Sequence, residues 1–277
     1  MTAFQHVLVG LDVHQQTAAD AILGRACELA QPDQIEAVHV CNRFHREHRD
    51  YPEGNFETSE ALDEAIHRQA GQYLKQVSGR RGITRVRVLQ GNAADAVHAY
   101  AKESTDLVVV GCHGHHGART LFGSTSNAMI HGTPCDVLAV HIDEGHDGHL
   151  PAYEKILVAV DLGDESFQVM EEANRVAEHC GAELAVCNVT QADYDPLLDE
   201  AAERLAHLAE SYGIDEENMF EVAGSVAHRV HALGTDIGAD LIVVGTHGKH
   251  GLQLLTGSTA NAVLHGARCD VLAVRMH

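Results

Sequence analysis

The chain alternates between short apolar runs and longer stretches in which apolar residues recur every three or four positions. Short apolar runs bounded by polar residues are typical of buried strands, whereas the longer periodic stretches predict amphipathic helices. In the first half of the chain the predicted strands are 6–11, 35–40, 84–89, 106–110 and 136–141. The predicted helices of this half are 17–30, 62–77, 93–102 and 124–131.

The second half repeats this alternation in the same order. Its predicted strands are 155–160, 184–189, 219–222, 241–244 and 270–275, and its predicted helices are 165–179, 198–209, 226–235 and 258–265. Strands that alternate with helices indicate a parallel sheet with helices on both faces. The sequence therefore predicts an α/β fold of two Rossmann-like (HUP-type) domains, each a five-stranded parallel sheet flanked by helices.

A passage of thirty residues occurs twice and shows that the chain is a duplication. Residues 111–140 and 245–274 are identical at 19 of 30 positions, without a gap. An internal repeat of this kind marks one structural unit that is used twice. We therefore predict two domains, 1–143 and 152–277, joined by a linker of about residues 144–151.

The spacing between the two copies locates an insertion. Asp12 and Asp161 each follow the first strand of their half and lie 149 positions apart, whereas Gly111 and Gly245 lie 134 positions apart. The second half therefore lacks 15 residues between its second and fourth strands. The polar segment 42–59, rich in histidine and arginine, is the predicted surplus of the first half.

Composition and charge narrow the function classes. A formal net charge of −21 argues against nucleic-acid binding, which relies on a basic surface. No apolar stretch is long enough to span a bilayer, and the chain does not start with a basic segment and a cleavage site. Seven cysteines without a CxxC pair fit a reducing compartment. We expect a cytoplasmic protein without membrane insertion.

Two features of each half would meet at the carboxyl ends of the predicted strands, where doubly wound sheets bind ligands. One is the aspartate after the first strand. The other is a glycine-rich segment after the fourth strand, because glycine permits positive φ and helix starts favour anions. The alternative is that these residues only turn the chain and cap a helix. The candidate residues are Asp12, Gly111, Gly114, Gly123, Ser124 and Thr125, and Asp161, Gly245, Gly248, Gly257, Ser258 and Thr259.

The 22 histidines raise a metal hypothesis, which their spacing does not favour. Cys112, His113, His115 and His116 lie almost next to one another, whereas structural zinc sites use ligand pairs separated by a longer segment. The second copy has Thr246 in place of Cys112. We therefore predict no metal site. The chain also has no GxSxG, P-loop, HExxH or CxxC motif, so an enzyme is not the first expectation.

The order of these elements, with an aspartate after strand one and G-x-x-G-x(8)-G-S-T after strand four, resembles the universal stress protein family over essentially the whole chain. The resemblance implies a strand order of 3-2-1-4-5 and, in the members that bind nucleotide, a site for ATP. It implies that the aspartate and first glycine lie near the ribose and the later Gly-Ser/Thr near the phosphates. Val40 and Val189 would contact adenine. Both copies have eight residues where nucleotide-binding members have nine, so occupancy stays open.

Three functions remain in view. The first is a cytoplasmic stress-response sensor or regulator that binds ATP, or AMP or ADP, with Mg²⁺ as a candidate companion ion. The second is a nucleotide-free interaction protein, and the third is a weak ATPase. Resemblance to dimeric members of the family implies that strands 136–141 and 270–275 pair across a two-fold axis. The two domains would then form an intramolecular pseudo-dimer, with a homodimer and an unidentified protein partner left open.

Overall fold

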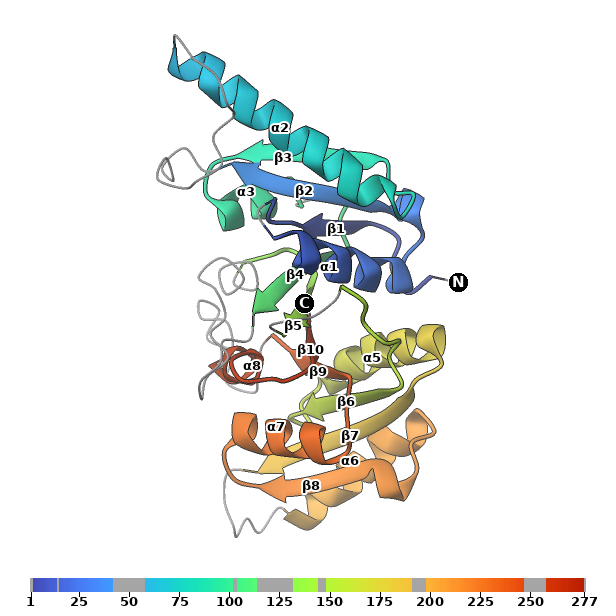
Figure 1. Cartoon of the computed structure of the whole chain (residues 1–277). Coiled ribbons are helices and arrows are strands. Elements are labelled where there is room, and N and C mark those ends of the chain that lie inside the picture. The colour runs from blue at the N-terminus through green and yellow to red at the C-terminus, as the bar shows by residue number, and fades with distance from the viewer. Residues whose placement is uncertain are drawn as a thin grey trace.

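The computed structural model describes residues 2–13, 15–41, 58–101, 104–113, 132–143, 148–190, 198–246 and 258–276. In these residues ten strands form one sheet, in the order β3-β2-β1-β4-β5-β10-β9-β6-β7-β8 (Figure 1). Neighbouring strands within each half are parallel. Each half therefore has the strand order 3-2-1-4-5, which confirms the expected α/β architecture.

The elements follow the order expected from the hydrophobic pattern. The first half contains β1 (Val7–Gly10), α1 (Gln16–Leu29), β2 (Ile35–Cys41), α2 (Ser59–Gly79), β3 (Arg85–Gln90), α3 (Ala93–Tyr100), β4 (Leu107–His113) and β5 (Asp136–Ile142). The second half contains β6 (Lys155–Val160), α5 (Ser166–Cys180), β7 (Glu183–Thr190), α6 (Leu198–Ser211), β8 (Met219–Ala223), α7 (Val226–Asp236), β9 (Leu241–Gly245), α8 (Ser258–Leu264) and β10 (Asp270–Val274). Short 3₁₀ turns, Pro32–Gln34 and Glu216–Asn218, precede β2 and β8.

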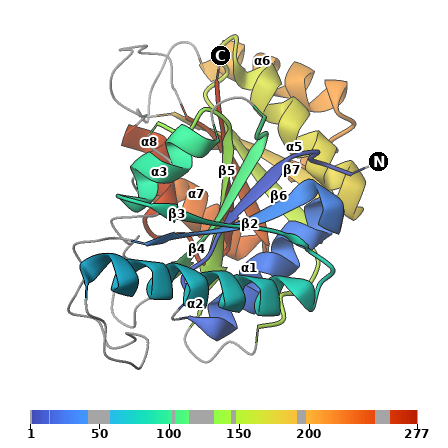
Figure 2. The ribbon, with the colours of Figure 1, turned by 90° about the horizontal axis from the view of Figure 1, so that it is seen from above.

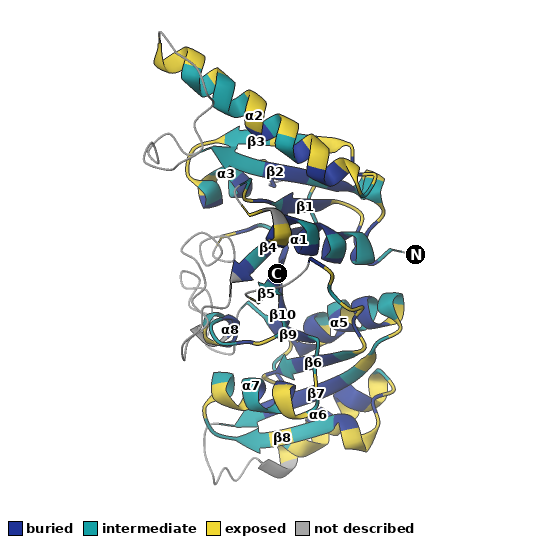
Figure 3. Ribbon diagram, in the orientation of Figure 1, coloured by how far each residue is buried: buried dark blue, intermediate teal, exposed yellow. Residues whose placement is uncertain are grey.

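Two apolar layers hold the sheet, one on each face. The layer under α1 and α5 runs through both halves without a break and includes Phe4, Leu23 and Met170. The layer on the opposite face packs under α3, α7 and α8. Central strands such as β4 and β9 are buried on both faces, which explains their unbroken apolar runs (Figures 2 and 3).

The two halves join through their last strands. β5 and β10 pair antiparallel, with Leu138 opposite Leu272 and Ala139 opposite Val271. This pairing is the one that the resemblance to dimeric members of the family implied for strands 136–141 and 270–275, and it makes one continuous sheet. Because each strand covers the other, neither of these two edges is open to another chain.

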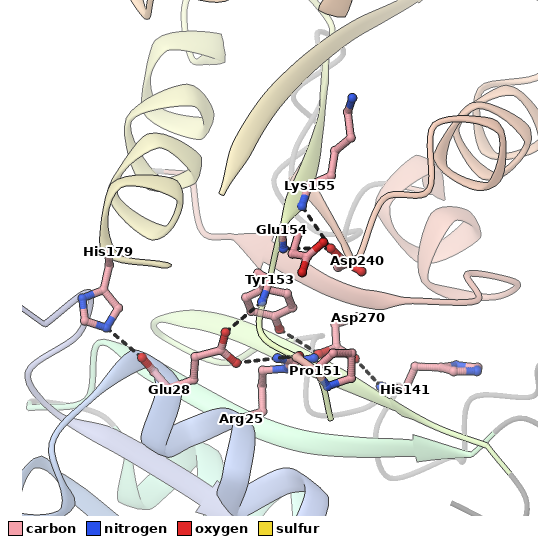
Figure 4. Close-up of polar contacts among 10 residues, drawn as sticks. All are labelled: Arg25, Glu28, His141, Pro151, Tyr153, Glu154, Lys155, His179, Asp240 and Asp270. Carbon is pink, nitrogen blue, oxygen red and sulfur yellow. Dashed lines mark hydrogen bonds and ion pairs between the residues drawn. The ribbon is translucent and has the colours of Figure 1, made fainter. Parts of the chain in front are cut away.

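A buried polar cluster lies beside this joint (Figure 4). The Nε of Arg25 in α1 donates to Asp270 in β10, at 2.7 Å, and the Tyr153 hydroxyl donates to the same carboxylate oxygen, at 2.7 Å. The Arg25 guanidinium also stacks 3.8 Å from the centre of the Tyr153 ring. Glu28 pairs with Arg25 and accepts the Tyr153 backbone N–H. Polar groups from both halves therefore satisfy one another's hydrogen bonds at the joint.

The end of the predicted linker packs on the first half. Gly148 adopts a φ of 87° and lies against Asp20 and Thr17 of α1. The carbonyl oxygen of Pro151 accepts a hydrogen bond from Arg25, at 2.8 Å. The described part of the linker is therefore a packed segment and not only a tether.

The described helices after the second strand differ in length between the two halves. Helix α2 spans 21 residues, whereas α6 spans 14. In Figure 1 the first turns of α2 project beyond the strands that it covers. The prediction that placed the surplus in segment 42–59 stays a prediction, although α2 begins at Ser59, three residues before the predicted helix start. Residues 42–57 lie outside the described part of the chain.

Candidate functional site

The strand order reverses between β1 and β4 in the first half, and between β6 and β9 in the second. The chain leaves β1 for β2 on one side and leaves β4 for β5 on the other. In open parallel sheets, the crevice at the carboxyl ends of such a pair of strands is the usual ligand site. The same geometry occurs at the carboxyl ends of β6 and β9.

In the first half, three of the predicted site residues gather at this crevice. Gly10 lies opposite Val38 in β2 and opposite Val110 in β4. Continuing this register places Asp12 beside Val40 and one position beyond the level of Gly111. Asp12 is exposed, whereas Val40 and Gly111 are half-buried. The Asp12 carboxylate follows β1, and the Val40 side chain and the Gly111 backbone belong to the two strands that flank it, β2 and β4.

The second half repeats the arrangement. Val160 lies opposite Asn188 in β7, and Ala159 lies opposite Val244 in β9. Asp161 therefore lies beside Val189 and one position beyond the level of Gly245. Asp161 is exposed, and Val189 and Gly245 are half-buried.

A residue of the second strand in each half anchors the turn that carries the aspartate. In the first half, a ring nitrogen of His39 hydrogen-bonds the carbonyl oxygen of Leu11, at 3.0 Å. In the second half, the Asn188 amide donates to the carbonyl oxygen of Val160, at 2.9 Å. His39 and Asn188 were not among the residues predicted for the site. Their common spacing of 149 residues, the same as between the two aspartates, was the available signal.

Several hydrogen bonds hold the turn after β6. Asp161 Oδ1 accepts the Gly163 backbone N–H, at 2.8 Å, and the Ser166 hydroxyl, at 3.3 Å. Leu162 adopts a left-handed φ of 57°, and Arg204 of α6 donates to its carbonyl oxygen. Asp161 therefore fixes the turn between β6 and α5 through Gly163 and Ser166.

Tyr73 of α2 occupies the position that Arg204 occupies in α6. Each of the two residues lies nine positions before a glycine with positive φ, Gly82 or Gly213, that follows its helix. The Tyr73 hydroxyl is buried and has no hydrogen-bond partner in the described part of the chain. Burial, followed by the carboxylates of Asp20 and Asp12, raises the pKa of Tyr73. The two halves therefore differ at this position, with a phenol in the first and a guanidinium in the second.

Gly111 and Gly245 are required by packing. A Cβ on Gly111 would lie 2.7 Å from Cδ1 of Ile22, and one on Gly245 would lie 3.1 Å from both Met276 Sδ and Val169 Cγ2. Neither glycine has a positive φ, because both belong to strands. Gly111 and Gly245 were expected to be turn glycines with positive φ, and this reason was wrong for both. The close approach of α1 and α5 to the sheet explains them.

The structure describes only two of the remaining motif residues, Ser258 and Thr259. Helix α8 begins at Ser258, as the sequence predicted for residues 258–265, and Thr259 lies in its first turn. The other members of the motif lie outside the described residues: Gly114, Gly123, Ser124, Thr125, Gly248 and Gly257.

No group of three or more metal-binding side chains occurs among the described residues, which do not include His115 and His116. All seven cysteines are free thiols. Burial raises the pKa of Cys187 to about 12 and that of Cys112 further, so neither is a ready nucleophile. No helix of the described residues has the length and apolar character needed to cross a bilayer.

Known proteins resemble the chain in both halves. The model of the universal stress protein family matches residues 3–141 and 152–275. Universal stress protein A homolog 2 of Coxiella burnetii is 38% identical over 140 residues, which cover 45% of this chain and 96% of that protein. A universal stress protein of Mycobacterium tuberculosis is 31% identical over 185 residues, which cover 61% of this chain and 62% of that protein.

The fold is shared with solved structures along its whole length. A universal stress protein from Archaeoglobus fulgidus superposes with a TM-score of 0.71 at 17% identity, covering 99% of this chain and 97% of that one. One from Pseudomonas aeruginosa gives 0.68 at 20% identity, covering 99% and 94%. With the family model matching both halves, the chain belongs to the universal stress protein family and carries two such domains in tandem.

Proposed function

We propose that the chain binds an adenine nucleotide, with ATP as the leading candidate, at the carboxyl edge of its sheet and acts as a stress-response sensor or regulator. The observation that carries this proposal is the convergence of Asp12, Val40 and Gly111 on three adjacent strands, repeated by Asp161, Val189 and Gly245. A carboxylate beside an apolar wall suits a ribose next to an adenine ring. Family membership supports the same ligand class.

In this proposal each residue has a defined task. The carboxylate of Asp12 or Asp161 accepts hydrogen bonds from the ribose hydroxyls, and the valine packs on the base. Backbone N–H groups after Gly111 and Gly245, together with Gly-Ser-Thr at the following helix start, hold the phosphates. A net charge of −21 opposes a polyanion, so Mg²⁺, AMP or ADP would lower the electrostatic penalty.

The wider setting is also a proposal. We retain domain limits of 1–143 and 152–277, a cytoplasmic location and an unidentified protein partner, with homodimerisation as a further option. Catalysis is not part of the leading proposal, because the sequence contains no GxSxG, P-loop, HExxH or CxxC motif. A weak ATPase is tested by turnover in Gly123→Val and Gly257→Val variants.

A nucleotide-free interaction protein is the second candidate, and two observations favour it. The packing of Ile22 on Gly111 accounts for this glycine without a ligand. The hydrogen bonds from Gly163 and Ser166 occupy one oxygen of Asp161 without a ligand. Both features would persist in a protein whose crevices are empty.

Two measurements separate these functions. Mass spectrometry of the denatured protein detects any nucleotide that co-purifies, and calorimetry with ATP and Mg²⁺ measures affinity. We expect Asp12→Asn and Asp161→Asn each to weaken binding at its own site by about tenfold to a hundredfold, the loss of a charged hydrogen bond. Asp33→Asn, an exposed change of the same charge before β2, is the control. Absence of nucleotide and of binding heat would favour the second candidate.

A further inference from the structure

The joint between the two halves contains a reciprocal pair of aspartates. Asp136 begins β5 and Asp270 begins β10, at matching places in the thirty-residue repeat. Asp270 Oδ1 accepts the backbone N–H of His141 in β5, and Asp136 Oδ1 accepts that of Arg275 just after β10, both at 2.8 Å. Both carboxyl groups are buried. The antiparallel pair of strands is therefore closed at each end by an aspartate of the opposite half.

The two aspartates differ in how their charge is balanced. Asp270 receives the Arg25 Nε–H and the Tyr153 hydroxyl. Phe4 occupies the position in the first half that Tyr153 occupies in the second, and it has no hydroxyl. Among the described residues, one hydrogen-bond donor reaches the Asp136 carboxyl, the N–H of Arg275.

The cations near Asp136 have other partners. The guanidinium of Arg275 donates to the carbonyl oxygen of Thr133, at 2.6 Å. Arg175 of α5 pairs with Glu172 and stacks 4.4 Å from the centre of the Phe4 ring. Its Nε is buried without a hydrogen-bond partner in the described chain. Neither guanidinium therefore forms an ion pair with Asp136.

The other titratable groups that face Asp136 add negative charge. Glu172 comes from α5, and Asp106 comes from the turn before β4, where it accepts the backbone N–H groups of Gln5 and His6. The neighbouring Cys135 thiol has a pKa raised to about 12, chiefly by burial, and stays neutral. Burial raises the pKa of Asp136 to about 7; Glu172 and Asp106 add to this effect, while the Arg275 N–H and Arg175 oppose it.

We propose that Asp136 makes the joint between the halves a pH-responsive contact, tighter when its carboxyl group is neutral and looser when it is ionised. The folded chain binds this proton more tightly than the unfolded chain, whose carboxyl titrates near 3.8. The free energy of unfolding therefore falls as pH rises from about 4 to about 7, and this contribution is constant above that range. This pH response of the joint does not require a nucleotide, so it is independent of the proposed function.

Asp136→Asn tests the proposal, because asparagine keeps the acceptor for the Arg275 N–H and removes the titration. Urea unfolding of the full chain is compared with the variant from pH 5 to pH 8.5, so that the histidines common to both cancel. We expect the ratio of the two unfolding equilibrium constants, wild type over variant, to rise about tenfold per pH unit up to about pH 6.5 and then to flatten. A ratio that stays constant across this range overturns the proposal. Asp33→Asn, an exposed change before β2 that keeps Asp136 and the charges that face it, should retain the wild-type pH dependence.

A measurement on the unaltered chain covers the case in which the variant does not fold. Hydrogen exchange of the Arg275 amide and of β5 and β10 is followed at pH 5.5 and pH 7.5, after correction for the intrinsic exchange rate. We expect protection at the joint to fall by about tenfold or more at the higher pH. Equal protection at both pH values contradicts a joint that loosens on ionisation.

Discussion

The Nε of Arg25 lies 2.7 Å from Oδ2 of Asp270, and the two side chains are only 4% and 3% exposed. These residues are 245 positions apart in the sequence and belong to different halves of the duplication. Their contact shields the charge of each from an apolar interior. The halves are therefore held together by a specific buried ion pair as well as by the strands β5 and β10.

Replacement of Arg25 by methionine should destabilise the whole chain. The change keeps most of the apolar stem but leaves Asp270 buried without its cation, which costs about 3–5 kcal/mol in comparable cases. Urea denaturation measures the loss. Arg87→Met removes an exposed contact with Glu36 and should cost about 1 kcal/mol or less. Equal losses in the two variants would show that Arg25 has no special role at the joint.

Tyr153→Phe should lower the free energy of unfolding by less than Arg25→Met does. The ring stays under the Arg25 guanidinium, and only the hydroxyl that donates to Asp270 is lost. We expect a loss of about 1–3 kcal/mol in the free energy of unfolding, the usual range for a charged hydrogen bond. Phe4→Tyr at the equivalent position of the first half is a useful counterpart. A Tyr153→Phe variant as stable as wild type would indicate that water replaces the hydroxyl.

The His39 contact predicts a difference between two substitutions. His39→Asn restores the residue type of the second half, where Asn188 bonds the equivalent carbonyl oxygen, and should change stability little. His39→Leu leaves the Leu11 carbonyl oxygen without this partner and should cost about 1–3 kcal/mol. Thermal unfolding compares the two. Similar melting temperatures for both variants would contradict the anchoring role.

The packing of Gly111 also predicts a stability effect that is independent of any ligand. Gly111→Ala forces Ile22 or the sheet to move, which typically costs about 1–3 kcal/mol. Gly79→Ala is the matched control, because it ends α2 with no atom within 4 Å of the added Cβ and should be neutral or stabilising. If Gly111→Ala left stability unchanged and abolished only nucleotide binding, a ligand would explain this glycine better than packing does.

The duplication and the hydrophobic pattern were enough to predict the order of elements, and the resemblance to dimeric members of the family predicted the joint between the last strands. The predicted ends of the elements were less accurate where pairing with a neighbouring strand decides them. The fourth strand was expected to end at Val110, but β4 continues to His113 because Cys112 and His113 pair with β5. The length of α2 was underestimated, because a solvated helix turn and a polar loop have similar composition.

The site was predictable as a set of positions, but the reasons for several residues were not. An apparent turn glycine, Gly111, is a packing residue, because the distance between α1 and the sheet is a property of the folded chain. Arg25 looked like one more charged helix residue, because its partner Asp270 lies in the other half. The difference between Asp136 and Asp270 depends on Arg25 and on the presence of Tyr153 where the first half has Phe4, and no local pattern connects these residues.

The most direct test of nucleotide binding at the carboxyl edge is methyl NMR of the valine-labelled chain titrated with ATP and Mg²⁺. The account predicts that the methyl resonances of Val40 and Val189 shift with saturable dependence on ATP. Val7, at the opposite end of β1, and Val271, in the joint, should stay unchanged. Shifts confined to one half would limit the site to that domain. No shift of either Val40 or Val189 at millimolar ATP, or shifts only at residues remote from this edge, would contradict the proposed site.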